Sequence, residues 1–155
     1  MQGNPKVIEI LNEVLTGELT AINQYFLHAS MAKNWGFEKI YQKVYHESID
    51  EMKHAQAITD RVLFLDGIPN LQKLDKLNIG ETIPEQYASD LKLELLALER
   101  LRRGVQLCTE IQDHTTRQLL ESILADEEQH VDWLETQLSI IETIGLQNYL
   151  TEMQA

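Results

Sequence analysis

Apolar residues recur along this chain at the spacing of amphipathic helices rather than in the alternation of strands. The first stretch shows the pattern, with apolar residues three or four positions apart at Ile8, Leu11, Leu15, Leu19, Ile22 and Phe26. Similar stretches predict four long helices, at roughly residues 5–34, 38–65, 83–111 and 114–144. A short fifth helix is expected after Gly145. The predicted fold class is therefore all-α.

Short connections join these helices in pairs. Asn4 followed by Pro5 is typical of a helix start, and Gly36 and Gly145 fall where the helical pattern breaks. Only a few residues separate the first helix from the second, and the third from the fourth, so each pair is expected to form an antiparallel hairpin.

The connection between the two hairpins is longer and mixes turn residues with apolar ones. Residues 66–81 include three turn residues and five apolar ones: Gly67, Pro69 and Gly80, and Ile68, Leu71, Leu74, Leu77 and Ile79. Because of these apolar side chains, we expect the segment to lie against the bundle surface. The prediction is a four-helix bundle with one long crossover between helices two and three, formed by residues 1–155 as a single domain.

The charge of the chain limits the partners that it could bind. With 25 Asp and Glu against 13 Lys and Arg, the formal net charge is −12, which repels nucleic-acid phosphates and anionic membrane surfaces. No apolar run approaches the roughly 18 residues that span a membrane, and the first fifteen residues do not resemble a signal peptide. We therefore expect a cytoplasmic protein that binds cations, with no nucleic-acid and no membrane partner.

A Glu-x-x-His motif occurs twice, in the second and the fourth predicted helix. Glu51 with His54, and Glu127 with His130, are three residues apart, so each pair shares one helix face. A single pair at this spacing arises easily by chance among surface residues. The second pair, however, follows the first by 76 residues at both positions. This repetition indicates a shared role for the four residues.

The same interval of 76 residues separates two further glutamates, Glu18 and Glu94. Apolar residues flank both of them, which predicts that their side chains point into the bundle. Each hairpin therefore offers one lone Glu and one Glu-x-x-His, and the two halves supply matched sets of ligands.

Four carboxylates in an apolar interior would each cost several kcal/mol to desolvate unless cations neutralise them. Two divalent ions balance four carboxylates, and carboxylate with imidazole suits iron or manganese, whereas a structural zinc site normally uses cysteine or more histidine. A core stabilised by buried ion pairs is the alternative, but it needs Lys or Arg in the set, and none has the required spacing. Cys108, the only cysteine, is expected to be a buried and inert thiol.

At these residues, and along nearly the whole chain, the sequence resembles the bacterioferritins. The resemblance is carried by all six ligands and by the segments GELTAINQYFLH (17–28), YHESIDEMKHA (45–55), LFLDGIPNL (63–71), DEEQHVDWLETQL (126–138) and GLQNYL (145–150). It implies a ferritin-like bundle in a hollow homo-24-mer, which oxidises Fe(II) at an iron pair in each subunit and stores the ferric product as a mineral. In this hypothesis, Glu51 and Glu127 bridge two irons that Glu18, Glu94, His54 and His130 complete, and dioxygen or hydrogen peroxide is the oxidant.

The resemblance also suggests roles for residues outside the repeated set. Met52 faces away from the iron site and has Glu128 as its repeat partner. The resemblance makes it the axial ligand of a haem b shared between two subunits, with interface packing as the alternative. A small ferredoxin would deliver electrons through that haem. Tyr25 either bonds a ligand carboxylate, supplies an electron or packs in the core.

Two further assignments follow from the same resemblance. His46 and Asp50, four residues apart, match an inner-surface iron site, with a solvated surface as the alternative. The resemblance also places four polar residues around a subunit pore: Asn34, Asp66, Asp132 and Asn148.

Three other functions compete with iron storage. A rubrerythrin-like peroxide reductase uses the same ligands, but its rubredoxin module needs four cysteines. A miniferritin-like DNA protector usually shares its metal site between subunits and often has a basic tail, unlike this acidic chain. A haem electron carrier with a vestigial iron site is disfavoured by the intact ligand set.

Overall fold

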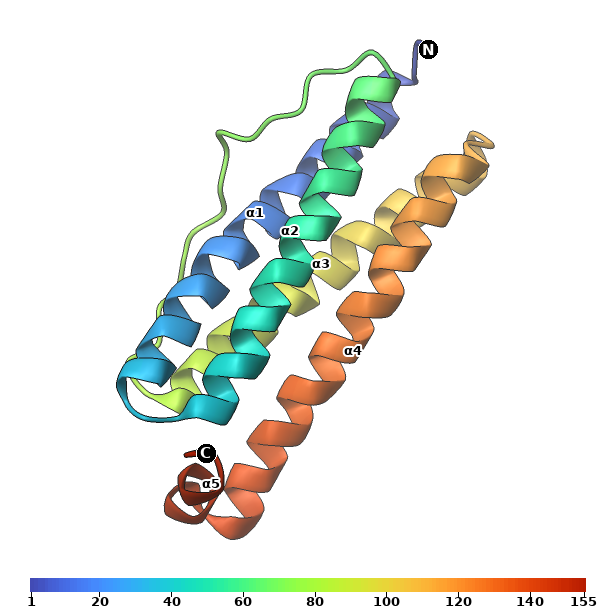
Figure 1. The fold of residues 1–155 in the computed structure, drawn as a ribbon. Coiled ribbons are helices and arrows are strands. Elements are labelled where there is room, and N and C mark those ends of the chain that lie inside the picture. The colour runs from blue at the N-terminus through green and yellow to red at the C-terminus, as the bar shows by residue number, and fades with distance from the viewer.

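The computed structural model covers residues 1–155 and contains five helices (Figure 1). Four are long, namely α1 (Pro5–Asn34), α2 (Glu38–Phe64), α3 (Ile83–Glu110) and α4 (His114–Ile144), and the fifth, α5 (Leu146–Glu152), is short. The all-α prediction is confirmed, and the predicted helix ends differ from the observed ones by at most one residue. No helix is long and apolar enough to span a membrane.

Local sequence signals explain where the helices begin and end. The Asn4 side chain accepts a hydrogen bond from the amide of Lys6, and Thr82 caps α3 by accepting one from the amide of Glu85. Gly36 and Gly145 have φ values of 91° and 85°, a left-handed conformation that other residues rarely adopt. These caps and breaks are short-range features, which is why the sequence pattern located the helices closely.

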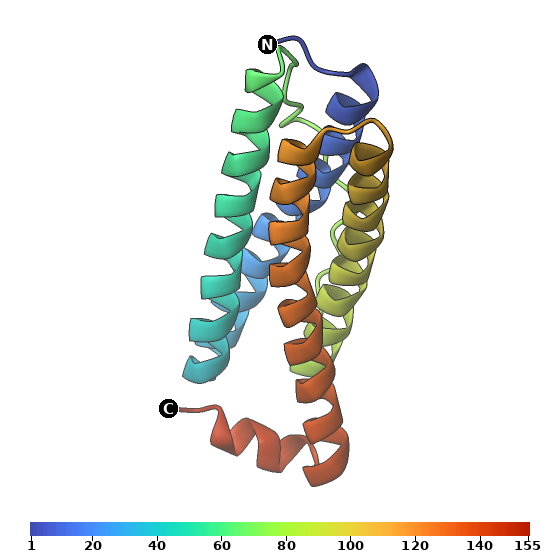
Figure 2. The ribbon, with the colours of Figure 1, turned by 90° about the vertical axis from the view of Figure 1, so that its right-hand side faces the viewer.

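The helices form two antiparallel hairpins, α1 with α2 and α3 with α4 (Figures 1 and 2). Helix α1 also packs on α3, whereas α2 and α4 touch little. Helix α5 turns across one end of the bundle, where Tyr149 is buried and its hydroxyl donates to Gln137 at 2.7 Å. The α2–α4 seam is therefore the loosely packed side of the bundle.

The crossover between α2 and α3 follows the bundle as predicted, but hydrogen bonds rather than apolar contacts hold it there. Four of its backbone amides, those of Asn70, Asp75, Asn78 and Gly80, donate to α1 side chains at 2.9–3.0 Å: Asn12, Thr20, Gln24 and His28. Its five apolar side chains, which were the reason for the prediction, are all exposed. That reason was wrong, because polar side chains of α1 at helical intervals satisfy the crossover backbone.

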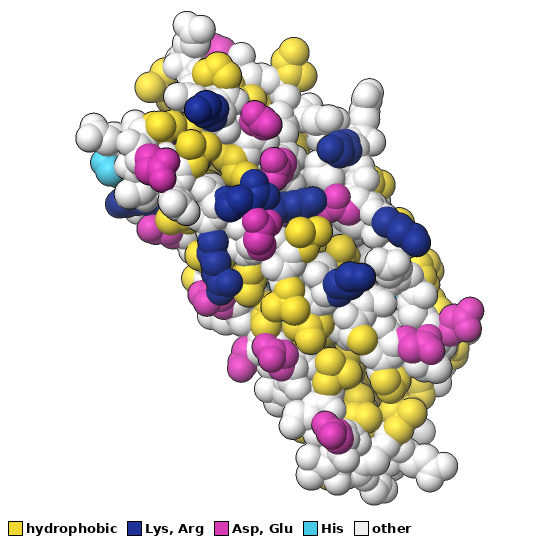
Figure 3. Space-filling view, turned by 180° about the vertical axis from the view of Figure 1, so that it is seen from behind, with side chains coloured by type: hydrophobic (Ala, Val, Ile, Leu, Met, Phe, Trp, Pro, Cys, Tyr) yellow, Lys and Arg dark blue, Asp and Glu magenta, His cyan; other side chains and the backbone are white.

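Apolar side chains therefore remain exposed along the crossover. Seen from the side opposite to Figure 1, apolar groups form a band between charged groups (Figure 3). Exposed large apolar residues of the crossover and neighbouring helices include Leu63, Phe64, Ile68, Leu71, Leu74 and Leu95. Because large apolar patches mark interaction sites, this exposure is consistent with assembly into an oligomer.

The core consists of two clusters. One is aliphatic, includes Leu11, Ile58 and Leu120, and contains Cys108 as the buried free thiol that was predicted. The other is partly aromatic and includes Tyr25, Tyr87 and Tyr149. Buried carboxylates and histidines lie outside both clusters.

Candidate metal centre

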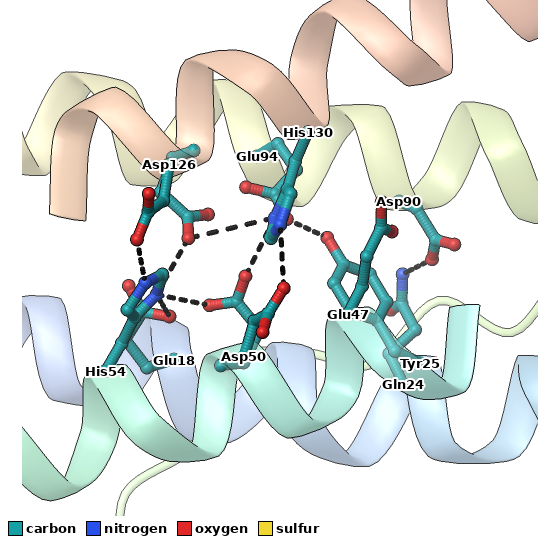
Figure 4. A network of polar contacts seen from close by, with 12 residues as sticks. Glu18, Gln24, Tyr25, Glu47, Asp50, His54, Asp90, Glu94, Asp126 and His130 are labelled. Atoms are coloured by element: carbon teal, nitrogen blue, oxygen red, sulfur yellow. Dashed lines mark hydrogen bonds and ion pairs between the residues drawn. The ribbon is translucent and has the colours of Figure 1, made fainter. Parts of the chain in front are cut away.

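The six predicted ligands come together inside the bundle (Figure 4). Each side chain is buried, and the four glutamates are at most 2% exposed. Glu18 comes from α1 and Glu94 from α3, while α2 and α4 each supply one Glu-x-x-His: Glu51 with His54, and Glu127 with His130. The repeat seen in the sequence therefore becomes a site built by four helices.

The ligand atoms form two overlapping groups, and in each group they lie within 4.8 Å of one another. One group adds Glu18 and His54 to the shared pair Glu51 and Glu127; the other adds Glu94 and His130 to the same pair. This division matches two adjacent metal positions with two bridging carboxylates.

Both histidines aim the same ring nitrogen into the site. His54 Nδ1 lies 3.0 Å from Glu127 Oε1 and 3.6 Å from Glu18 Oε2. His130 Nδ1 lies 3.0 Å from Glu51 Oε1 and 3.4 Å from Glu94 Oε1. Each imidazole thus points Nδ1 at the glutamate of the opposite Glu-x-x-His helix.

Polar atoms of the site are buried without well-formed hydrogen bonds. Nine buried side-chain atoms of the protein lack a hydrogen-bond partner, and seven belong to this site: both carboxylate oxygens of Glu18 and Glu51, one each of Glu94 and Glu127, and Nδ1 of His54. Unsatisfied buried polar atoms are rare in native proteins. Here they face one space rather than one another, so the donor set of four carboxylates and two imidazoles fits a pair of divalent metal ions.

In the metal-free protein, the histidines supply the positive charge that the carboxylates require. Burial opposes the charged form of both rings, but close contact with the Glu51 carboxylate outweighs it, and the pKa rises to about 9 for His54 and about 10 for His130. The ion pairs of the four glutamates are all with these two histidines, not with Lys or Arg. Protons on the imidazoles therefore occupy the role that metal ions would take.

The two bridging candidates differ in the metal-free state. Burial opposes the charge of Glu51, but the close imidazoles of His130 and His54 outweigh it and lower its pKa to about 2. Burial, together with the charges of Glu94 and Glu51, raises the pKa of Glu127 well above its ordinary value. The surroundings thus favour the charged form of Glu51 and the neutral form of Glu127.

Tyr25 bonds a ligand carboxylate and also packs in the core, so two of the alternatives considered for it hold together. Its hydroxyl donates to Glu94 Oε1, and its ring is fully buried in the aromatic cluster. Burial and the charge of Glu94 raise the pKa of the phenol well above its ordinary value. The phenol is consequently a stable hydrogen-bond donor.

Several polar residues next to the site were not identified in the sequence. Asp126 lies 2.9 Å from His54 Nε2. Asp90 accepts from Gln24 at 2.8 Å and pairs with His28 at the same distance, beside Tyr25 and Glu47 (Figure 4). Only Asp126 had a usable signal, since it follows Asp50 by the repeat interval of 76 residues. The others depend on contacts between helices that spacing does not reveal.

The remaining predicted residues lie outside the centre. His46 and Asp50 approach each other to 3.6 Å, and Asp50 also lies 3.8 Å from His130 Nε2. Met52 is 59% exposed on the outer face of α2. A cavity of about 210 Å³ opens between α2 and α4 and is lined by Asp50, Lys53, His54, Asp126, Gln129 and His130.

The four residues assigned to a pore do not converge within one chain. All of them are exposed. Asn34 ends α1 close to the turn into α2, whereas Asp66 lies at the opposite end of that hairpin, 3.2 Å from the terminal amine. A pore lined by all four would require several subunits.

Comparison with known proteins places the chain among related sequences. The Ferritin family model, described as a ferritin-like domain, matches residues 8–144. The chain is 54% identical over 149 residues to the bacterioferritin of Mycolicibacterium paratuberculosis, covering 96% of this chain and 94% of the relative. It is 50% identical over 151 residues to the bacterioferritin of Streptomyces coelicolor (97% and 90% covered) and 46% identical over 151 residues to the bacterial ferritin of Pseudomonas aeruginosa (97% of each).

Proposed function

Because the chain belongs to the ferritin-like domain family and, within it, to the bacterioferritins, we propose that its six buried ligands bind and oxidise the iron that it stores. The protein is an iron-storage protein with ferroxidase activity, converting Fe(II) to Fe(III). The observation that carries the assignment to these residues is the pair of overlapping ligand groups that share Glu51 and Glu127. We regard residues 1–155 as a single unit with this function.

Each ligand has a defined role in this proposal. Glu51 and Glu127 bridge two Fe(II) ions, which are the substrate. Glu18 and His54 complete one position, and Glu94 and His130 complete the other. When bound, the two ions supply one electron each to dioxygen or hydrogen peroxide. Four hard carboxylates favour the higher charge of Fe(III) and thereby stabilise the product.

The protein's own groups also manage protons. His54 and His130 are protonated in the metal-free protein and must lose those protons before Nδ1 can bind a cation. The cavity between α2 and α4 lies directly outside both rings and provides a polar route for cations and protons. His46 and Asp50, at 3.6 Å on the same seam, would hold iron that passes along this route.

The assembly and the second cofactor belong to the same proposal. Exposed apolar side chains on the crossover and α2 support a homo-24-mer, in which Met52 of two subunits would hold one haem b. Met52 is accessible on the surface and cannot reach the buried iron ligands, so its thioether is free for this role. A small ferredoxin would reduce the stored iron through the haem, and the protein would act in the cytoplasm.

The test is an anaerobic titration of the metal-free protein with Fe(II), followed by admission of air. We expect saturation at two irons per chain, rapid formation of ferric absorbance, and continued iron uptake by a particle the size of a hollow shell. Absence of tight binding would refute the metal centre.

The same experiment separates storage from the peroxide-reductase alternative. If two irons per chain cycle between oxidation states with hydrogen peroxide while no mineral accumulates, the rubrerythrin-like reading gains support. The single cysteine already counts against it, because that family's rubredoxin module needs four.

A further inference from the structure

Asp126 is a half-exposed residue of α4 whose carboxylate contacts a buried ligand on another helix. Its Oδ2 lies 2.9 Å from His54 Nε2, a normal hydrogen-bond distance. The Asp126 side chain is 54% exposed, whereas the His54 ring is buried. The carboxylate therefore reaches in from the mouth of the α2–α4 cavity.

The contact determines which nitrogen of His54 carries hydrogen. A carboxylate can only accept a hydrogen bond, so Nε2 must be the donor. Nδ1 faces Glu18, Glu51 and Glu127, and it offers a lone pair to a metal ion once the ring has given up its second proton. The hydrogen bond also opposes rotation of the ring, which would withdraw Nδ1 from the site (Figure 4).

The repeat contains a second aspartate in the corresponding position. Asp50 precedes Glu51 as Asp126 precedes Glu127, and each approaches the histidine of the opposite helix. The two contacts differ, because Asp50 Oδ2 is 3.8 Å from His130 Nε2, too far for a hydrogen bond, and also faces His46. Only one of the two ligand histidines is held by such a bond.

From this geometry we propose, on the basis of the function above, that Asp126 is a positioning residue for the iron site formed by Glu18 and His54. It keeps Nδ1 of His54 directed at the metal by accepting the hydrogen of Nε2. Carboxylate partners of this kind typically contribute 10- to 100-fold to metal affinity. Asp126 does not touch the metal, so its effect passes entirely through His54.

A competing explanation makes the contact an ion pair that exists only in the metal-free protein. In that case Asp126 would stabilise protonated His54 and compete with metal binding, so its removal would tighten binding. Positioning has the opposite consequence, because a ring that is no longer oriented binds the metal more weakly. The sign of the change therefore decides between the two explanations.

The experiment uses the assembled, metal-free protein titrated anaerobically with Co(II), whose d–d absorbance reports each ion bound. Wild type should bind two Co(II) per chain. For Asp126→Ala we expect one ion bound as in wild type and the other about 10- to 100-fold more weakly. Asp126→Asn retains an oxygen acceptor and should recover part of the lost affinity. Glu128→Gln is the matched control, since Glu128 is exposed on the same helix and contacts no histidine.

Particle size and the melting temperature of each metal-free variant verify that the shell is intact. Unchanged or tighter Co(II) binding by Asp126→Ala would overturn the proposal, and so would equal weakening of both ions. If wild type itself bound no Co(II), the result would refute the proposed metal centre and therefore also the proposed role of Asp126.

Discussion

The two hairpins supply the same ligands but surround them differently. Glu18, Glu51 and His54 of the first correspond to Glu94, Glu127 and His130 of the second, each 76 residues later, and all six are buried together. Outside this set the correspondence fails, since the equivalents of Tyr25 and Met52 are Leu101 and Glu128. The comparison teaches that a two-metal site requires matched ligands, whereas the contacts around them are free to specialise.

The specialised contacts make the two metal positions unequal. Glu94 accepts a hydrogen bond from Tyr25, while neither oxygen of Glu18 has a partner. Conversely, Asp126 holds His54 on the Glu18 side through a hydrogen bond to Nε2. On the Glu94 side, Nε2 of His130 has no such bond, because Asp50 is too far away. Each metal position thus has one ligand that an outer residue orients.

Removing the lone glutamate of either hairpin is the strongest test of whether the two hairpins contribute equivalent ligands. Glu18→Ala and Glu94→Ala should each slow rapid Fe(II) oxidation at least about 100-fold, because each deletes one direct ligand. Stopped-flow absorbance of ferric iron in assembled shells measures the rate. If one variant kept wild-type kinetics, the matched roles of the two glutamates would be refuted.

Replacing Met52 tests the greatest difference between the hairpins. Met52→Leu conserves volume on an exposed face of α2, so we expect an intact shell, unchanged ferroxidase kinetics and haem reduced at least about tenfold. The Soret absorbance per subunit after reconstitution measures haem. The repeat-equivalent variant Glu128→Gln should keep its haem, and full haem content in Met52→Leu would contradict the assignment.

The bridging glutamates should differ in the metal-free protein. The pKa of Glu51 lies below its unfolded value, so its charge stabilises the fold at pH 7, and this contribution is lost as the pH falls through about 2. Glu51→Gln should therefore lower the melting temperature of the metal-free protein at pH 7. Burial and the charges of Glu94 and Glu51 raise the pKa of Glu127, so Glu127→Gln should lower the melting temperature less. Thermal unfolding at one protein concentration measures the melting temperatures of both variants. Equal decreases would contradict the difference between the two glutamates.

Metal binding should release protons from both histidines. With pKa values of about 9 and 10, His54 and His130 are charged at pH 7 and must be neutral to coordinate. We expect at least two protons per chain on saturation with Co(II), and an affinity that rises with pH between 6 and 8. A pH indicator in weak buffer detects the release. Fewer than one proton per chain would show that the rings are already neutral.

The sequence predicted the parts of the fold that depend on local signals. Asn4, Pro5, Gly36 and Gly145 mark helix boundaries by themselves, and the six ligands share a repeated interval. Resemblance to a known family added the iron chemistry, which the comparisons confirm.

What sequence alone missed are contacts between distant elements. The crossover was expected to lie against the bundle because of its apolar side chains, and it does lie there, but His28 and three other α1 side chains bind its backbone. The bond between Asp126 and His54 spans 72 residues and joins α4 to α2, so the repeat interval from Asp50 marks Asp126 but does not reveal its partner. The sequence indicated that the buried carboxylates need positive charge. It did not indicate that His54 and His130 can supply that charge in the metal-free protein, which follows from their distances to the carboxylates.

The hydroxyl of Tyr25 provides the finest test of the inequality between the two metal positions. Tyr25→Phe removes the donor to Glu94 and leaves the ring in the aromatic cluster, so the fold should be unaffected. Because the hydroxyl orients only Glu94, Co(II) affinity should fall up to about tenfold at the Glu94 and His130 position and stay unchanged at the other. The Asp126→Ala variant should weaken the opposite position, so the two changes together would weaken both. If both variants affected the same ion, the hairpins would not be specialised in the way that their outer contacts indicate.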